Sequence, residues 1–177
     1  MLLNAKKMAF LGLLLALTVL LIVLSGVFEF NTLFLLAAAS FGVGIAIRET
    51  NLRFGAGFYV AAIFLSVMLA PNKLYCLTFA AMGLYIVIIE FTFDKLTYFK
   101  TKLNRRMLFW IIKYIVFNLM FLPMLILLPK LIYQGELHAG ITGALFIGGQ
   151  AALLIYDMAY NYFQKMIWGK VRNKLQL

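Results

Sequence analysis

Cysteine and histidine are almost absent from this sequence, which has one of each among its 177 residues, Cys76 and His138. A single cysteine excludes an internal disulfide framework and a cysteine metal cluster, and it is typical of a buried, inert thiol. A single histidine excludes a histidine-rich metal site and a relay between two histidines. We therefore expect neither a metal nor a cofactor.

Acidic residues are scarce as well: there are six, against sixteen basic residues, and only 12% of the chain is charged. The six do not form a D-x-x-D or E-x-x-H cluster. The sequence also lacks the P-loop, the Rossmann glycine pattern and the G-x-S-x-G nucleophile elbow. These absences argue against an enzyme, and against a chain that hydrolyses a nucleotide by itself.

Apolar residues, in contrast, make up 65% of the chain, and its mean hydropathy is +0.99. A soluble domain is only about 45–50% apolar, so the excess must face lipid. The net charge of +10 lies in short clusters between apolar runs. Such clusters are typical of topology signals and of contact with anionic lipids, so we expect the lipid bilayer as a partner and no nucleic acid.

Six apolar runs are long enough, or nearly long enough, to cross a bilayer, which takes about twenty residues. The runs are Met8–Phe28, Phe30–Ile47, Phe54–Ala70, Leu74–Phe93, Met107–Leu128 and Ala139–Met166. They predict an all-α bundle of about six transmembrane helices, forming a single transmembrane domain over residues 1–177. The second and third runs are short, which leaves a re-entrant segment as the alternative for one of them.

The basic residues predict the orientation of the chain. Thirteen of the sixteen lie on one side of the predicted spans: Lys6, Lys7, Arg48, Arg53, Lys95, Lys100, Lys102, Arg105, Arg106, Lys165, Lys170, Arg172 and Lys174. By the positive-inside rule this side is cytoplasmic, so we expect both termini inside and a location in the inner or plasma membrane. The cytoplasmic loop from Asp94 to Arg106 has amphipathic spacing. It is either a basic topology loop or a docking surface.

Polar residues inside the predicted spans form two layers. Asn118 and Gln150 each lie eleven residues inward from the outer end of their runs, at a depth of about 16 Å. They either form an interhelical hydrogen bond or line the floor of an outward-facing pocket for a small molecule. Deeper, Glu90, Lys113 and Asp157 share a level. Structural ion pairing is the preferred interpretation, and proton or ion coupling is the alternative.

The outer rim offers further candidates. Asn72 and Lys73 follow Pro71 in a very short turn, and Tyr75 lies next to them. Lys73 departs from the positive-inside pattern, so it either snorkels or meets an anionic group on a ligand. We predict substrate binding by Asn72, Lys73 and Tyr75 at the rim of the pocket and by Asn118 and Gln150 at its floor.

Small residues recur at four-residue spacing in the sixth run. Gly140, Ala144, Gly148 and Ala152 form a ridge that lets another helix approach closely. The ridge serves either packing within the chain or an interface with another subunit.

The first run begins with Lys6 and Lys7 and continues with a small-x-x-x-small motif, Gly12-x-x-x-Ala16. With its length, six predicted helices and no ATPase motif, the chain resembles the S components of energy-coupling-factor transporters. The resemblance implies capture of a vitamin or micronutrient from outside. It also implies docking through Gly12 and Ala16 onto a transmembrane partner subunit that works with two ATPases. It covers the whole chain in architecture, but only this stretch in motif, and it implies no ligand residues.

A second resemblance is to the small membrane subunit of the bacterial rod-shape cell-wall machinery, a multi-span scaffold without a catalytic motif. A scaffold would need no polar outer pocket. The two interpretations therefore differ in what the outer rim and the layer of Asn118 and Gln150 do.

Overall fold

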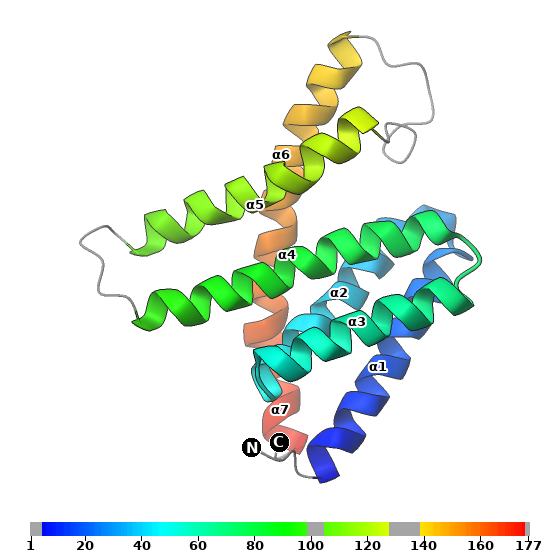
Figure 1. Ribbon diagram of the computed structural model, residues 1–177, viewed down its shortest axis with the longest axis vertical. Helices are drawn as coiled ribbons and strands as arrows, with labels where there is room; N and C mark the ends of the chain where they lie inside the picture. Colours follow the sequence, from blue (N-terminus) through cyan, green and yellow to red (C-terminus); the bar gives the residue numbers. More distant parts are fainter. Residues whose placement is uncertain (1–4, 99–104, 128–138, 176–177) are drawn as a thin grey trace. The chain divides into compact units, whose positions relative to one another are not determined.

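The computed structural model of the protein describes residues 5–98, 105–127 and 139–175, and all regular structure in these ranges is helical. Six long helices follow one another (Figure 1): α1 (Ala5–Ser25), α2 (Thr32–Glu49), α3 (Leu52–Leu69), α4 (Lys73–Tyr98), α5 (Arg105–Leu127) and α6 (Ala139–Tyr162). A 3-10 turn, η1 (Glu29–Asn31), precedes α2. A π-helix, η3 (Phe163–Trp168), leads from α6 into α7 (Gly169–Leu175).

All six predicted spans are present as helices that are long and apolar enough to cross a membrane, the sixth counted from Gly140 to Arg172. The predicted all-α bundle of six transmembrane helices is thus confirmed. The two short runs, α2 and α3, are each one unbroken helix of 18 residues, so neither has the shape of a re-entrant segment. Eighteen residues span about 27 Å, close to the thickness of the hydrocarbon layer.

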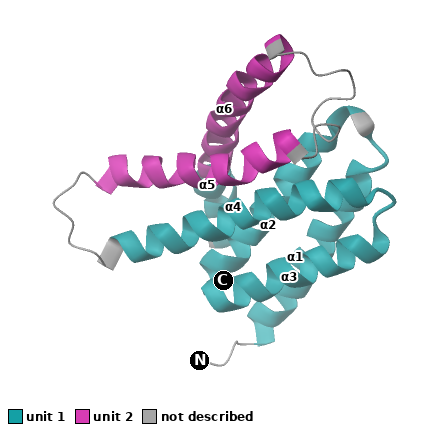
Figure 2. Cartoon of the chain, turned by 45° about the horizontal axis from the view of Figure 1, so that its top comes forward, with its two compact units in different colours: residues 1–99, 163–177 teal, residues 100–162 magenta. Residues whose placement is uncertain are grey.

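The described residues divide into two compact units (Figure 2). Unit 1 contains α1 to α4 together with η3 and α7, and unit 2 contains α5 and α6. The single transmembrane domain over residues 1–177 stays a prediction. The outer loop Pro129–His138 and residues 99–104 of the amphipathic loop lie outside the described residues.

The core of unit 1 is built around α2. About 61% of its membrane span is buried, against 28% of the span in α1. Small residues let the neighbouring helices approach it closely: a Cβ added at Gly42 would lie 2.6 Å from Oγ1 of Thr18 on α1. Leu36 and Val43 of α2 are fully buried, as are Ile22 of α1 and Phe79 of α4.

The chain from Gly140 to Arg172 is 33 residues long, about 50 Å if helical throughout, which exceeds the hydrocarbon layer. Its last part does not extend alone into solvent. The ring of Phe163 packs at a tilt against that of Phe41 of α2, with 5.3 Å between the centroids, and the rings of Trp168 and Phe10 of α1 are 5.4 Å apart. The C-terminal segment, residues 163–175, is therefore an integral part of unit 1.

Candidate functional site

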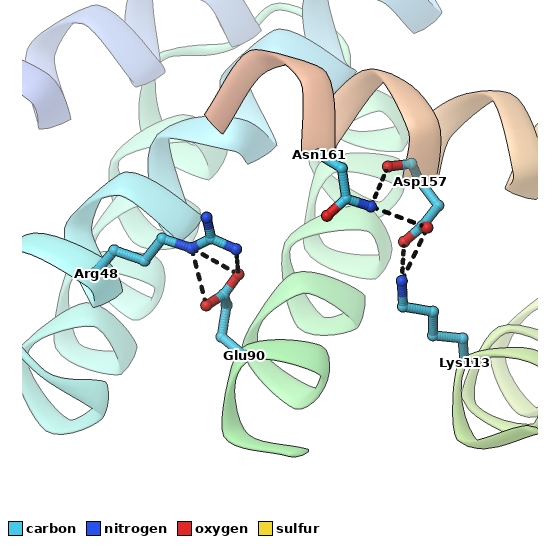
Figure 3. A network of polar contacts seen from close by, with 5 residues as sticks. All are labelled: Arg48, Glu90, Lys113, Asp157 and Asn161. Carbon is cyan, nitrogen blue, oxygen red and sulfur yellow. Dashed lines mark hydrogen bonds and ion pairs between the residues drawn. The ribbon is translucent and has the colours of Figure 1, made fainter. Parts of the chain in front are cut away.

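Unit 1 contains an ion pair between α2 and α4, in which the carboxylate is buried and the guanidinium is 37% exposed. Glu90, which is 7% exposed, accepts hydrogen bonds from Nε of Arg48 on both carboxylate oxygens at 3.0 Å, and a third bond from a terminal guanidinium nitrogen (Figure 3). Arg48 stands in the last turn of α2. The contact is bidentate, which is the strong arrangement for arginine and a carboxylate.

Unit 2 contains a second ion pair, between α5 and α6, in which both groups are buried. Nζ of Lys113 lies 2.7 Å and 2.8 Å from the two carboxylate oxygens of Asp157, and the two side chains are 4% and 3% exposed (Figure 3). Asn161 donates to Asp157 at 3.1 Å. The ammonium also lies 4.4 Å from the ring of Phe109 and 4.9 Å from that of Trp110, so aromatic faces add to its stabilisation.

Of the predicted layer of Glu90, Lys113 and Asp157, the structure brings the last two together. Glu90 belongs to unit 1, where Arg48 is its partner. Sequence reasoning missed this role of Arg48, because it counted the residue with the basic cluster between two spans. One signal was present: Arg48 and Glu90 are both near the basic ends of their runs.

Asn118 of α5 and Gln150 of α6 also meet. Nε2 of Gln150 donates to Oδ1 of Asn118 at 2.8 Å, and Nδ2 of Asn118 lies 3.5 Å from Oε1 of Gln150. Nδ2 of Asn118 donates in addition to the carbonyl of Tyr114 at 2.9 Å. The two residues are half-buried, and each carboxamide uses the other as its partner. The equal depth of Asn118 and Gln150 in the sequence therefore indicated a real contact. The structure shows it as a hydrogen bond between two helices, which stabilises their packing.

Two of the three rim residues, Asn72 and Lys73, form hydrogen bonds with backbone groups at helix ends. Nζ of Lys73 donates to the carbonyls of Val67 and Ala70 at the end of α3. Oδ1 of Asn72 accepts from the backbone N–H of Leu74 at 3.0 Å, at the start of α4. Tyr75 is half-buried beside the core of unit 1. The lysine that departs from the charge pattern thus satisfies carbonyls that a helix end leaves without partners.

The rim residues belong to unit 1 and Asn118 and Gln150 to unit 2, so the pocket that would join them stays a prediction. Among the described residues, no group of three or more histidine, cysteine, aspartate or glutamate side chains could hold a metal ion.

The predicted docking motif on α1 is accessible. Gly12 and Ala16 are both exposed, and a Cβ added at Gly12 would meet no atom within 4 Å. On α6, Gly140, Ala144, Gly148 and Ala152 are exposed too. The close approach within unit 2 is made by another residue, Gly149, where an added Cβ would lie 2.5 Å from the ring of Phe121.

Six apolar helices, with charges paired inside them, define the class of the molecule as a multi-pass helical membrane protein. No family model, curated protein or solved structure matches the chain. Its function must therefore be argued from its own residues.

Proposed function

We propose that the protein is the substrate-capturing membrane subunit of an ATP-driven importer, similar to the S components of energy-coupling-factor transporters. The observation that carries the proposal is the open face of α1 around Gly12 and Ala16. A small-x-x-x-small face lets the backbone of another helix come close, and in lipid this packing provides much of the association energy.

The chain would depend on partners for energy. Its sequence has no P-loop, so ATP hydrolysis would take place in separate ATPases, reached through the transmembrane partner that docks on α1. The ligand would be a vitamin or another small micronutrient; the candidates for contacting it are Asn72, Lys73 and Tyr75 in unit 1 and, separately, Asn118 and Gln150 in unit 2. Substrate-binding membrane subunits of this kind are multi-pass proteins with both termini in the cytoplasm, which agrees with the charge pattern.

The test is purification of the tagged chain from its native membrane in mild detergent, followed by mass spectrometry of proteins and small molecules. We expect a transmembrane protein, two P-loop ATPases and one small molecule at constant stoichiometry. The variant Gly12→Leu/Ala16→Leu should lose the partner proteins and keep the small molecule. Gly57→Leu is the matched control, because Gly57 of α3 is equally exposed and open.

Retention of the partners by the Gly12→Leu/Ala16→Leu variant, with Gly57→Leu unchanged, would exclude α1 as the docking face. A chain that purifies without any small molecule and without ATPases would exclude the importer.

The second candidate is a non-catalytic scaffold resembling the small membrane subunit of the rod-shape cell-wall machinery. The reciprocal hydrogen bonds of Asn118 and Gln150 favour it, as does the use of Lys73 to close α3. These contacts give Asn118, Gln150 and Lys73 each a structural role, which a scaffold without a ligand pocket would require. A scaffold would co-purify with membrane proteins of an assembly, without P-loop ATPases and without a bound small molecule.

A further inference from the structure

The end of α2 is a junction for three distant parts of unit 1. Oε1 of Glu49 accepts a hydrogen bond from the indole N–H of Trp168 at 2.9 Å, across 119 residues of sequence, and it forms an ion pair with Nε of Arg172 at 3.3 Å. The backbone carbonyl of Glu49 accepts from Nζ of Lys7 at 2.9 Å. The start of α1 and the C-terminal segment are thereby fixed to one residue.

This junction has more positive than negative charge. Lys7 and Arg172 both contact Glu49, and Glu49 contributes the single carboxylate among the three. Glu49 is 2% exposed in its side chain, whereas Arg172 is 55% exposed. Among the described residues, the ion pair with Glu49 is the one polar contact of Arg172, and it is made through Nε. Within that part of the chain the two terminal guanidinium nitrogens have no partner, and we take them as the donors for an anion.

The junction lies at the basic end of unit 1. Lys6 and Lys7 lie in the first turn of α1, Arg48 in the last turn of α2, Arg53 in the first turn of α3 and Lys95 in the last turn of α4, whereas Lys73 begins α4 at its opposite end. In a bilayer this end lies among lipid headgroups, in the cytoplasmic leaflet by the positive-inside prediction. Anionic lipids of that leaflet attract basic residues at the surface.

Exposed apolar residues adjoin both cations in the sequence. Met8 follows Lys7, Val171 precedes Arg172, and Ile167 lies one helical turn before Val171; their exposed fractions are 58%, 37% and 47%. Exposed apolar surface therefore lies near both cations along their helices, on faces next to those of Lys7 and Arg172. This combination fits an amphiphile better than a soluble anion, because an acyl chain gains from contact that a hydrated ion does not.

We propose that Lys7 and Arg172 bind the phosphate of an anionic phospholipid, and that Glu49 and Trp168 are positioning residues. The guanidinium group matches phosphate oxygens with two parallel N–H donors, and a carboxylate on Nε fixes its plane. The indole fixes the carboxylate in turn. The lipid site does not depend on substrate capture, so the experiments that test it do not test the proposed importer.

The experiment is native mass spectrometry of the purified full chain with phosphatidylglycerol and phosphatidylcholine of identical acyl chains. We expect the wild type to retain phosphatidylglycerol preferentially. Arg172→Gln should lower that preference about tenfold, as should Lys7→Gln, since each removes charge-assisted hydrogen bonds to the phosphate in addition to the general attraction of a cation to an anionic surface. Lys95→Gln is the matched control: it removes the same charge at the same end of unit 1, where the ammonium of Lys95 lies 5.6 Å from the ring centroid of Phe91 and has no contact with Glu49 among the described residues.

Glu49→Gln separates a positioned site from general electrostatics. It keeps an acceptor for Trp168 but removes the ion pair with Arg172, and it makes the protein more positive. A positioned site predicts weaker binding of phosphatidylglycerol, whereas general attraction predicts stronger binding. Stronger binding in Glu49→Gln, or an equal loss in Lys95→Gln, would overturn the proposal.

A last measurement concerns the source of the phosphate. Phosphatidylglycerol should raise the thermal unfolding temperature of the wild type, and millimolar inorganic phosphate should not. Protection by inorganic phosphate alone would identify a soluble phosphate as the ligand and would contradict the lipid site. If Arg172→Gln does not elute as a monodisperse peak, Lys7→Gln takes its place in the comparison.

Discussion

At the scale of single residues, Gln164 departs from the usual pairing of buried polar groups. It is 5% exposed, and neither carboxamide atom has a hydrogen-bond partner among the described residues. Leaving a buried polar group without a partner costs about 1–3 kcal/mol. Gln164→Met keeps the length of the side chain and removes both polar atoms. We therefore expect it to raise the free energy of unfolding by about 1 kcal/mol.

The matched comparison is Gln150→Met, which removes one partner of Asn118 and should lower the free energy of unfolding by about 1 kcal/mol. Both changes would be measured by reversible unfolding in mixed micelles. A less stable Gln164→Met would mean that the carboxamide holds a water molecule or a ligand.

Lys113 and Asp157 allow a sharper test, because both are buried and bonded to each other. Lys113→Met should lower the free energy of unfolding by about 3–5 kcal/mol, since it leaves a buried carboxylate without its counter-charge. Adding Asp157→Leu should restore most of the loss. If the double variant is as unstable as the single one, the pairing of charges is not what Lys113 contributes.

Residue pairs were predictable where both members are polar and lie deep within a span. Two such pairs are Asn118 with Gln150 and Lys113 with Asp157. The position of each residue along its predicted span was enough to place the members of a pair at the same level. The contact of Trp168 with Glu49 was not predictable. Hydropathy and periodicity describe neighbours within one helix, whereas this bond joins residues 119 positions apart.

At the scale of elements, Lys73 connects two helices. Its ammonium donates to carbonyls at the end of α3 while the residue itself begins α4. Lys73→Met should lower the free energy of unfolding by about 0.5–1 kcal/mol, because a cation near the C-terminal end of a helix is stabilising. Lys95→Met, an exposed lysine of α4, is the control. Unchanged stability together with weaker ligand binding would instead assign Lys73 to the ligand.

The number and type of the elements followed from the sequence, but their ends did not. The fourth run was predicted to end at Phe93, whereas α4 continues to Tyr98; the third was predicted to begin at Phe54, whereas α3 begins at Leu52. An apolar run in the sequence ends where the chain leaves the hydrocarbon layer of the membrane. A helix ends instead where its backbone groups find caps, as at Asn51, whose side chain accepts from the backbone N–H of Phe54.

At the scale of the whole molecule, the orientation in the membrane is the prediction with the widest consequences. Leu74 and Lys95 are exposed near opposite ends of α4, and 21 residues of helix separate them by about 32 Å. In a Cys76→Ala background, Leu74→Cys should react with an impermeant maleimide in intact cells. Lys95→Cys should react only after permeabilisation, because thirteen basic residues indicate that its side is cytoplasmic.

Cys76 is the single cysteine of the chain, so its replacement by alanine leaves a background without a thiol. Labelling of Lys95→Cys in intact cells would reverse the topology. The proposed rim would then face the cytoplasm, and capture of a nutrient from outside would lose its basis.

The burial of α2 also has a consequence for how the protein is made. The helix ends in Arg48 and Glu49, and it is synthesised before their partners. Glu90 lies 42 residues after Arg48, and Trp168 lies 119 residues after Glu49. A newly inserted α2 therefore carries its charges ahead of their counterparts. Unit 1, as described, is therefore complete only after Trp168 and Arg172 have left the ribosome.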